Sequence, residues 1–375
     1  PEALGIRDLW VAGERIIAME SSLPEPPQAL TSEVIDLSGA ALIPGLIDAH
    51  VHVTGGGGED GPATRVPRLG LSRLTRAGVT SVVGVLGTDG TTRTIRDLVA
   101  TTLGLRDQGL NAWCYTGSYE IPPITLTGSV RDDIVFVDPI IGVGELAISD
   151  HRSSHPTLDE LARVAADAHV AGLISGKSGV VHVHMGDGRR GFELLRRLLD
   201  ETELPPSLFH PTHVNRQRWL FEEAPELAKR GMTVDVTAFP GDDESYSAPE
   251  ALDRWLHAGH PVNRITCSSD GAGCLPVFGD DSRVCAMDIG QPMAVVETMQ
   301  ALSEAGHALD TILPFFTTNV ATVTGLSSKG RIAASSEADL VILDDDISVQ
   351  SVMCRGRWLV RDEEVVVPGT FEKLV

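Results

Sequence analysis

The chain has 375 residues, which exceeds the usual size of one domain and favours either a large barrel-type domain with an appendage or two domains. Its net charge of −22 would repel polyanions, so the composition argues against nucleic acid and anionic membranes as partners. No apolar run approaches the roughly 20 residues of a membrane span, and no signal-type segment is expected at the start. The five cysteines are odd in number and widely spaced, which favours reduced thiols. Together these features predict a soluble cytoplasmic protein.

Both ends of the chain predict short antiparallel strands. Residues 8–12 and 14–19 alternate apolar and polar side chains, and a proline-rich link then leads to another short run at 33–37. Similar runs return near the other end, at 338–343, 349–355 and 358–360. Because the two sets match in length and alternation, we predict one small β-sandwich built from residues 1–44 and 328–375.

The middle of the chain predicts a (β/α)8 TIM barrel, an α/β fold, over residues 45–327. The predicted strands are 46–53, 80–86, 111–115, 140–148, 180–185, 207–213, 233–239 and 265–269. The predicted helices include 92–106, 157–171, 191–201, 249–258, 293–305 and 309–324. Eight strand–helix units of this length match a barrel inserted into the sandwich, and a doubly wound sheet is the alternative.

The first barrel strand carries two histidines on one face. Side chains alternate faces along a strand, so His50 and His52 point the same way. A single strand histidine is usually structural, but two imidazoles side by side make half of a metal site. The run Gly55–Gly58 follows, and it either forms a mobile loop that carries Glu59 over the same face or is only a flexible lid.

Histidines and carboxylates recur where other predicted strands end, which is the end of a barrel where functional groups gather. These clusters are Glu145 with Ser149–Arg152, His182–Gly186, His210–Arg216 and Ser268–Gly271. Imidazoles and carboxylates suit zinc, and four histidines with two carboxylates are enough for two ions about 3.5 to 4 Å apart with a bridging hydroxide, an arrangement used for hydrolysis. Asp270 could then accept a proton from the attacking water and return it to a leaving amine.

At these residues the sequence resembles the amidohydrolase superfamily and, within it, the isoaspartyl dipeptidase family. The superfamily features are the opening segment 44–52, the return strand 337–341 and the barrel inserted in a split sandwich. The narrower resemblance covers nearly the whole chain. It rests on Gly55–Glu59, Leu86–Asp89, Thr116–Tyr119, Ala147–Arg152, His184–Asp187, Pro211–Arg216 and Ser268–Gly271.

The resemblance implies a set of metal ligands and one departure from the family pattern. The implied ligands are His50, His52, His184, His213 and Asp270, which is also the acid/base. The family's usual bridging ligand is a lysine carbamylated by carbon dioxide, and Glu145 stands at that position. Because glutamate is shorter, the strand must bulge inward or the metals must shift. We predict two zinc ions bridged by Glu145 and hydroxide, with a single ion as the alternative, and activity that does not depend on bicarbonate.

The resemblance also implies how a substrate is held. An isoaspartyl dipeptide carries a free ammonium group and two carboxylates around a β-amide. Glu59 is suited to the ammonium group, while Arg152 and Arg216 offer bidentate forks to the carboxylates. Tyr119 would donate its hydroxyl to the carbonyl oxygen as that atom becomes an oxyanion.

Three further polar residues enter with smaller roles. Thr88 and Ser118 are weaker candidates for substrate contacts. Cys274 stands where the family has a serine that touches a substrate carboxylate, and a thiol is a weak donor, so affinity or side-chain preference is expected to differ.

The sequence as a whole therefore predicts a metal-dependent isoaspartyl dipeptidase acting on a small dipeptide. An N-acyl amino acid deacylase or a cyclic-amide hydrolase of the same superfamily is the alternative within enzymes, and a non-catalytic scaffold is the alternative outside them. The resemblance implies a homo-oligomer, without fixing the number of subunits.

Overall fold

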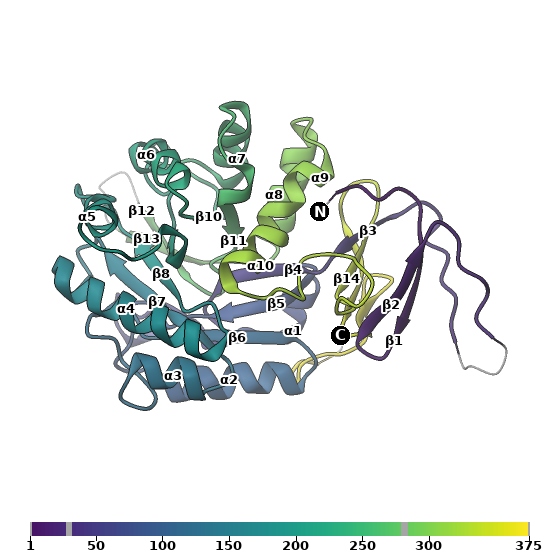
Figure 1. The fold of residues 1–375 in the computed structure, drawn as a ribbon, viewed down its shortest axis with the longest axis horizontal. Helices are drawn as coiled ribbons and strands as arrows, with labels where there is room; N and C mark the ends of the chain where they lie inside the picture. The colour runs from purple at the N-terminus through teal and green to yellow at the C-terminus, as the bar shows by residue number, and fades with distance from the viewer. Residues whose placement is uncertain (1, 28–31, 279–283, 374–375) are drawn as a thin grey trace.

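A computed structural model describes residues 2–27, 32–278 and 284–373. Both ends of the chain meet in one small domain (Figure 1). One of its sheets pairs β1 (Asp8–Ala12) with β2 (Arg15–Glu20). The other has the order β17-β16-β15-β14-β3, with β3 (Ala41–Pro44), β14 (Leu340–Leu343), β15 (Val349–Cys354), β16 (Arg357–Arg361) and β17 (Glu364–Val365).

The two sheets of this small domain pack through apolar side chains. Ile16 of the first sheet is buried in one cluster with Leu340 and Met353 of the second. A backbone hydrogen bond from Ile16 to Ser336 joins the two chain ends directly. The predicted sandwich from both chain ends is therefore confirmed, while the domain limits 1–44, 45–327 and 328–375 stay a prediction.

The parallel strands form the centre of the large domain. Six of them make one curled sheet in chain order, namely β4 (Leu46–Val51), β5 (Val79–Gly84), β6 (Asn111–Thr116), β7 (Ile140–Ile148), β8 (Val180–Met185) and β9 (Phe209–Thr212). Two more, β10 (Val234–Thr237) and β11 (Ile265–Ser268), pair with each other. Hydrogen bonds from Val214 to Asp235 and from His52 to Gly271 close the ring, which confirms the (β/α)8 barrel.

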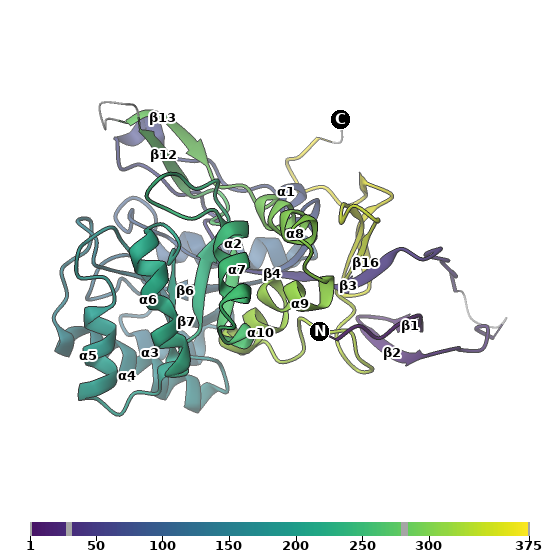
Figure 2. The same cartoon turned by 90° about the horizontal axis from the view of Figure 1, so that it is seen from above.

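Helices surround these strands (Figures 1 and 2). Their bounds are α1 (Leu71–Thr75), α2 (Ile95–Asp107), α3 (Val130–Phe136), α4 (Leu158–Ser175), α5 (Glu193–Glu201), α6 (Arg218–Lys229), α7 (Ala248–His257), α8 (Ala294–Glu304), α9 (Leu309–Ile312) and α10 (Thr318–Thr324). Thr157 caps the N-terminus of α4, because Thr157 and Glu160 form a reciprocal capping box. None of the helices in the described part of the chain is both long and apolar enough to cross a membrane.

Two parts of the large domain differ from the sequence prediction. The helix predicted over 309–324 is divided into α9, a 3-10 turn at Leu313–Phe316 and α10, because Pro314 lacks the backbone N–H that a continuous helix requires. A hairpin of β12 (Cys274–Phe278) and β13 (Val284–Ile289) follows β11 and was not predicted. Both segments follow the last barrel strand, where the regular alternation of strand and helix ends.

The glycine run after β4 packs against neighbouring backbone segments. Gly55 and Gly56 are buried, and Gly56 donates a backbone hydrogen bond to Ala272. A Cβ atom on Gly55, whose φ is +80°, would lie 1.9 Å from the backbone oxygen of Val66. The glycines therefore allow two backbone segments to approach closely, and the mobility expected of this loop stays a prediction.

Candidate metal centre

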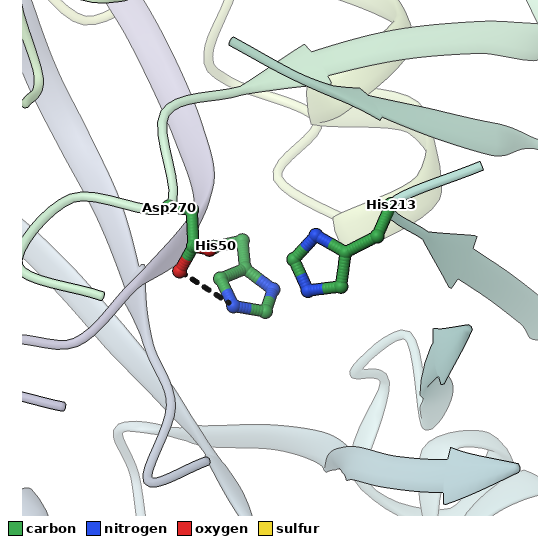
Figure 3. Close-up of side chains that lie close together, drawn as sticks. All are labelled: His50, His213 and Asp270. Atoms are coloured by element: carbon green, nitrogen blue, oxygen red, sulfur yellow. Dashed lines mark ion pairs between the residues drawn. The ribbon is translucent and has the colours of Figure 1, made fainter. Parts of the chain in front are cut away.

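The two β4 histidines face the carboxylate that follows β11. His50 is fully buried and His52 is nearly so. Their Nε2 atoms lie 3.5 Å and 3.0 Å from Oδ1 of Asp270. Figure 3 shows the His50 and Asp270 side chains turned toward each other, with His213 beside them. His50 and His52 lie on the same face of β4 because side chains alternate along a strand. Asp270 lies beside them because the barrel closes between β4 and the segment that follows β11.

Glu145 reaches the same group from β7 because the strand is irregular there. The pairing of β7 with β8 shifts register between Val143 and Leu146, on either side of Glu145. A Cβ atom on Gly144 would lie 2.7 Å from both Cβ and the backbone oxygen of His182, so a larger residue would push the two strands apart. The strand is therefore irregular at Glu145, as expected if a bulge lets this short side chain reach the site.

The two oxygens of Glu145 face different groups of histidines. Oε1 lies 3.5 Å from Nε2 of His50 and 3.7 Å from Nε2 of His52. Oε2 lies 3.0 Å from Nδ1 of His184 and 3.6 Å from Nε2 of His213. All six predicted ligands therefore lie together, with Glu145 between the two pairs of histidines.

This donor set fits divalent metal ions. Nitrogen and oxygen ligands about 2.0 to 2.2 Å from a tetrahedral zinc ion stand a little over 3 Å from one another, which matches the 3.0 to 3.7 Å separations between these donor atoms. Within the described part of the chain, Nε2 of His50 and Oδ1 of Asp270 are buried without a hydrogen-bond partner of good geometry. Buried polar atoms that lack such a partner are the atoms that a bound cation would satisfy.

The carboxylates of the centre are held as anions. Burial by itself would raise the pKa of Glu145, but His50, His184 and His213 lower it well below its usual value. Burial likewise opposes ionisation of Asp270, whose pKa is nevertheless held well below its usual value by the neighbouring imidazoles of His50 and His52. A buried pair of anions among imidazoles calls for positive charge, and a metal ion supplies it.

Asp150 is a functional candidate that the sequence reasoning did not single out. It is buried, and its Oδ2 lies 3.1 Å from Nε2 of His184. The same carboxylate accepts two hydrogen bonds from the Arg152 guanidinium, at 3.0 Å and 2.7 Å. Asp150 thus orients one metal ligand and one substrate-binding candidate. The segment Ala147–Arg152 was noted for its resemblance to the family, but no role was predicted for the carboxylate within it.

The remaining predicted residues surround a cleft above the ligands. Its walls include Glu59, Thr88, Tyr119, Arg152, Arg216 and Cys274. Arg152 also lies 3.4 Å from Glu59, and Arg216 donates to Asp270 at 2.6 Å. Ser118 is buried but does not line this cleft, so the structure gives it no place at the site.

Tyr119 is placed between the metal ligands and the arginines. Its hydroxyl lies 2.9 Å from Nδ1 of His184, and its ring lies 5.2 Å below the guanidinium carbon of Arg152. Burial, with a further contribution from Glu145, raises the pKa of Tyr119 well above its usual value. The phenol therefore keeps its proton near neutral pH and can act as a hydrogen-bond donor.

The fold and the site together define a class of protein. Residues 41–359 match the model of the amidohydrolase family, so the chain belongs to this family. Two solved structures of a β-aspartyl dipeptidase from Fervidobacterium islandicum AW-1 are similar over almost the whole chain. One, in complex with β-Asp-Leu dipeptide, is 44% identical with a TM-score of 0.92 and covers 96% of this chain and 94% of that chain. The other is 42% identical with a TM-score of 0.90 and covers 97% and 95%.

These likenesses confirm the resemblance to the isoaspartyl dipeptidase family. A curated relative, adenine deaminase 2 of Rhizobium etli, is more distant, at 26% identity over 342 residues. The match covers 88% of this chain but only half of that relative's length. Solved structures of D-hydantoinases, at 16% to 17% identity, share the fold alone.

Proposed function

We propose that this chain hydrolyses the β-amide bond of isoaspartyl dipeptides with two zinc ions held by His50, His52, Glu145, His184, His213 and Asp270. The observation that carries the proposal is the placement of Glu145, whose two oxygens face two separate groups of ligands beneath a cleft with charged walls. The likeness to a β-aspartyl dipeptidase solved with β-Asp-Leu supports the choice of substrate.

The charged groups of the cleft suit a zwitterionic dipeptide. Glu59 would bind the substrate ammonium group, and Arg152 and Arg216 would bind the carboxylates. Each of these side chains is about 30% exposed, so the charged ends can meet a ligand without a large rearrangement. An acylated amino group or an uncharged ring would leave Glu59 without a cation to bind, which makes the deacylase and cyclic-amide alternatives less suitable.

The residues around the scissile bond have separate tasks. When bound, the metal ions would polarise the amide carbonyl and lower the pKa of water. The Tyr119 hydroxyl donates a hydrogen bond to the carbonyl oxygen as negative charge develops on it. The Asp270 carboxylate, an anion in the folded chain, accepts a proton from the attacking water and returns it to the departing amine.

Metal analysis and substrate comparison on the purified chain test the proposal. Elemental analysis should find two zinc ions per chain, and β-Asp-Leu should be cleaved while its α-linked isomer is not. An N-acetyl amino acid, dihydrouracil and adenine serve as substrates for the deacylase, cyclic-amide and deaminase alternatives. A metal-loaded chain that leaves β-Asp-Leu intact, or prefers one of the other three, would overturn the proposed function.

A matched pair of variants separates substrate binding from metal binding. Arg216→Lys keeps the positive charge but loses the planar fork, so KM for β-Asp-Leu should rise at least tenfold while the zinc content is unchanged. Arg218→Lys alters a neighbouring arginine whose side chain contacts Ser245 and Tyr246, away from the cleft, and should behave as the wild type. An unchanged KM for Arg216→Lys would argue against the carboxylate role.

Two further parts of the proposal concern the whole molecule. Cytoplasmic location is supported by Cys114, Cys267 and Cys354, which are buried free thiols. Assembly into a homo-oligomer rests on the family resemblance and is to be measured by sedimentation.

A further inference from the structure

A row of polar side chains fills the barrel interior next to the metal ligand His50, and the proposed reaction does not use it. The row consists of His182 on β8, His210 on β9, Thr266 on β11 and Asp235 on β10, and is called the His182 row below. All four side chains are fully buried. Polar groups at such depth lower stability unless each has a partner, so their arrangement needs an explanation.

The members of the His182 row contact one another in a single line. Nδ1 of His50 lies 2.8 Å from Nε2 of His182. Nδ1 of His182 lies 3.1 Å from Nδ1 of His210, and Nε2 of His210 lies 2.9 Å from Oγ1 of Thr266. The Thr266 hydroxyl donates to Oδ1 of Asp235 at 2.6 Å.

The far end of the row is the side chain of Asp235, whose oxygens accept hydrogen bonds from three hydroxyl groups. Besides Thr266, the donors are Thr212 and Ser268, at 2.7 Å and 2.6 Å. A hydroxyl group that donates its only proton to a carboxylate oxygen can only accept from a further partner. The Thr266 hydroxyl therefore points its proton at Asp235, and its oxygen is left to accept from His210.

The two ends of the row fix the direction of every hydrogen bond between them. Burial lowers the pKa of His210 to about 4, so this ring is neutral and carries one N–H group. If Nε2 of His210 donates to Thr266, its Nδ1 must accept from His182. His182 then has its proton on Nδ1 and accepts on Nε2, and His50 must carry its proton on Nδ1.

We infer that the His182 row is a positioning device that fixes the tautomer of His50, leaving its Nε2 lone pair free for a metal ion. Nε2 is the His50 nitrogen that faces Glu145 and Asp270, each at 3.5 Å. The residues of the row touch neither substrate nor metal. This inference rests on the proposed metal binding by His50, and it adds His182, His210, Thr266 and Asp235 to the residues that determine metal affinity.

A substitution at Thr266 should change the tautomers of His210, His182 and His50 in turn. Thr266→Val keeps the shape of residue 266 but removes the acceptor for His210, and Oδ1 of Asp235 lies 4.0 Å from Nε2 of His210, too far to replace it. His210 would then favour the other tautomer, His182 would reverse in turn, and His50 would carry its proton on Nε2. The metal ion would have to compete with that proton.

Zinc affinity of the metal-free protein, measured by competition with a chromophoric chelator, is the test. Thr266→Val should weaken zinc binding by about 10- to 100-fold, the usual effect of losing a partner of a metal-ligating histidine. Thr266→Ser keeps the hydroxyl and should restore affinity to within about twofold of wild type. Thr212→Val removes a hydroxyl from the same carboxylate but lies outside the row, so it should leave zinc affinity unchanged.

A second pair of variants applies if Thr266→Val does not fold. His182→Leu breaks the row at its centre, whereas Tyr115→Phe alters the ring stacked 5.0 Å from His182, and the Tyr115 hydroxyl has no hydrogen-bond partner within the described residues. Only His182→Leu should lose affinity. Equal weakening by Thr266→Val and Thr212→Val, or by His182→Leu and Tyr115→Phe, would overturn the inference. A wild-type chain that binds no zinc would instead refute the proposed function.

Discussion

The charge of Glu145 offers the sharpest test of the metal centre. Glu145→Gln preserves the shape of the side chain but converts one of its two oxygens into an NH2 group, which cannot bind a metal. In the wild type, Oε1 lies 3.5 to 3.7 Å from Nε2 of His50 and His52, and Oε2 lies 3.0 to 3.6 Å from the nearest nitrogens of His184 and His213. In the variant, one of these two histidine pairs no longer faces a carboxylate oxygen. Removing one partner of a buried charge pair costs about 3 to 5 kcal/mol of free energy. The affinity for one metal ion should therefore fall between about a hundredfold and a few thousandfold.

The assay is zinc stoichiometry under a fixed concentration of chelator, together with kcat/KM for β-Asp-Leu. Asp133→Asn is the matched control, because Asp133 is a buried carboxylate that accepts from Thr116 and Thr127 and belongs to neither ligand group. The control should keep its metal even if it is less stable. Full zinc content and full activity in Glu145→Gln would refute the bridging role of Glu145.

Three other outcomes follow from the structure. Tyr119→Phe should lower kcat by about 10² to 10³ with little change in KM, as measured with β-Asp-Leu at saturating zinc, and an unchanged kcat would remove Tyr119 from the reaction. Cys274→Ser replaces a weak donor by a stronger one and should lower KM a few-fold, whereas a higher KM would contradict a carboxylate contact. Burial is the largest single effect on the pKa of Glu337 and raises it, but the hydrogen bond and charge of Lys329, with a hydrogen bond from Ser328, together lower that pKa below its usual value. The stabilising effect of Glu337 is therefore present above about pH 4.5 and is lost as the pH falls through the lowered pKa. Glu337→Gln should reduce the free energy of unfolding by about 1 to 3 kcal/mol at pH 7, and denaturant titrations should find that this difference shrinks as the pH falls below 4.5.

The architecture could be predicted because it depends on local patterns. Alternating strand and helix segments gave the barrel, and the matching runs at both ends gave the sandwich. The side-chain period of a strand placed His50 and His52 on one face before any coordinates were known. Where the pattern was interrupted by a single residue, as at Pro314, the prediction over 309–324 was wrong.

The parts that the sequence hid are contacts between distant segments. Asp150 lies two residues before Arg152 in sequence, but only the fold brings it to His184 on the next strand. The packing of Gly55 against Val66 likewise depends on a neighbouring loop, which no pattern within the glycine run indicates. No individual role was predicted for His182 or His210, because their link to His50 joins three different strands of the barrel.

The bulge at Glu145 shows how a backbone change can replace a covalent modification. A carbamylated lysine, which the family resemblance implies at this position, reaches its metals by the length of the side chain. In this chain the strand is irregular between Val143 and Leu146, and the shorter Glu145 carboxylate lies between both pairs of histidines. Because the Glu145 oxygens already have four imidazoles within 3.0 to 3.7 Å, no space is left for a longer side chain. Glu145→Lys should therefore give an inactive protein that bicarbonate does not rescue, because the irregular strand suits the shorter side chain.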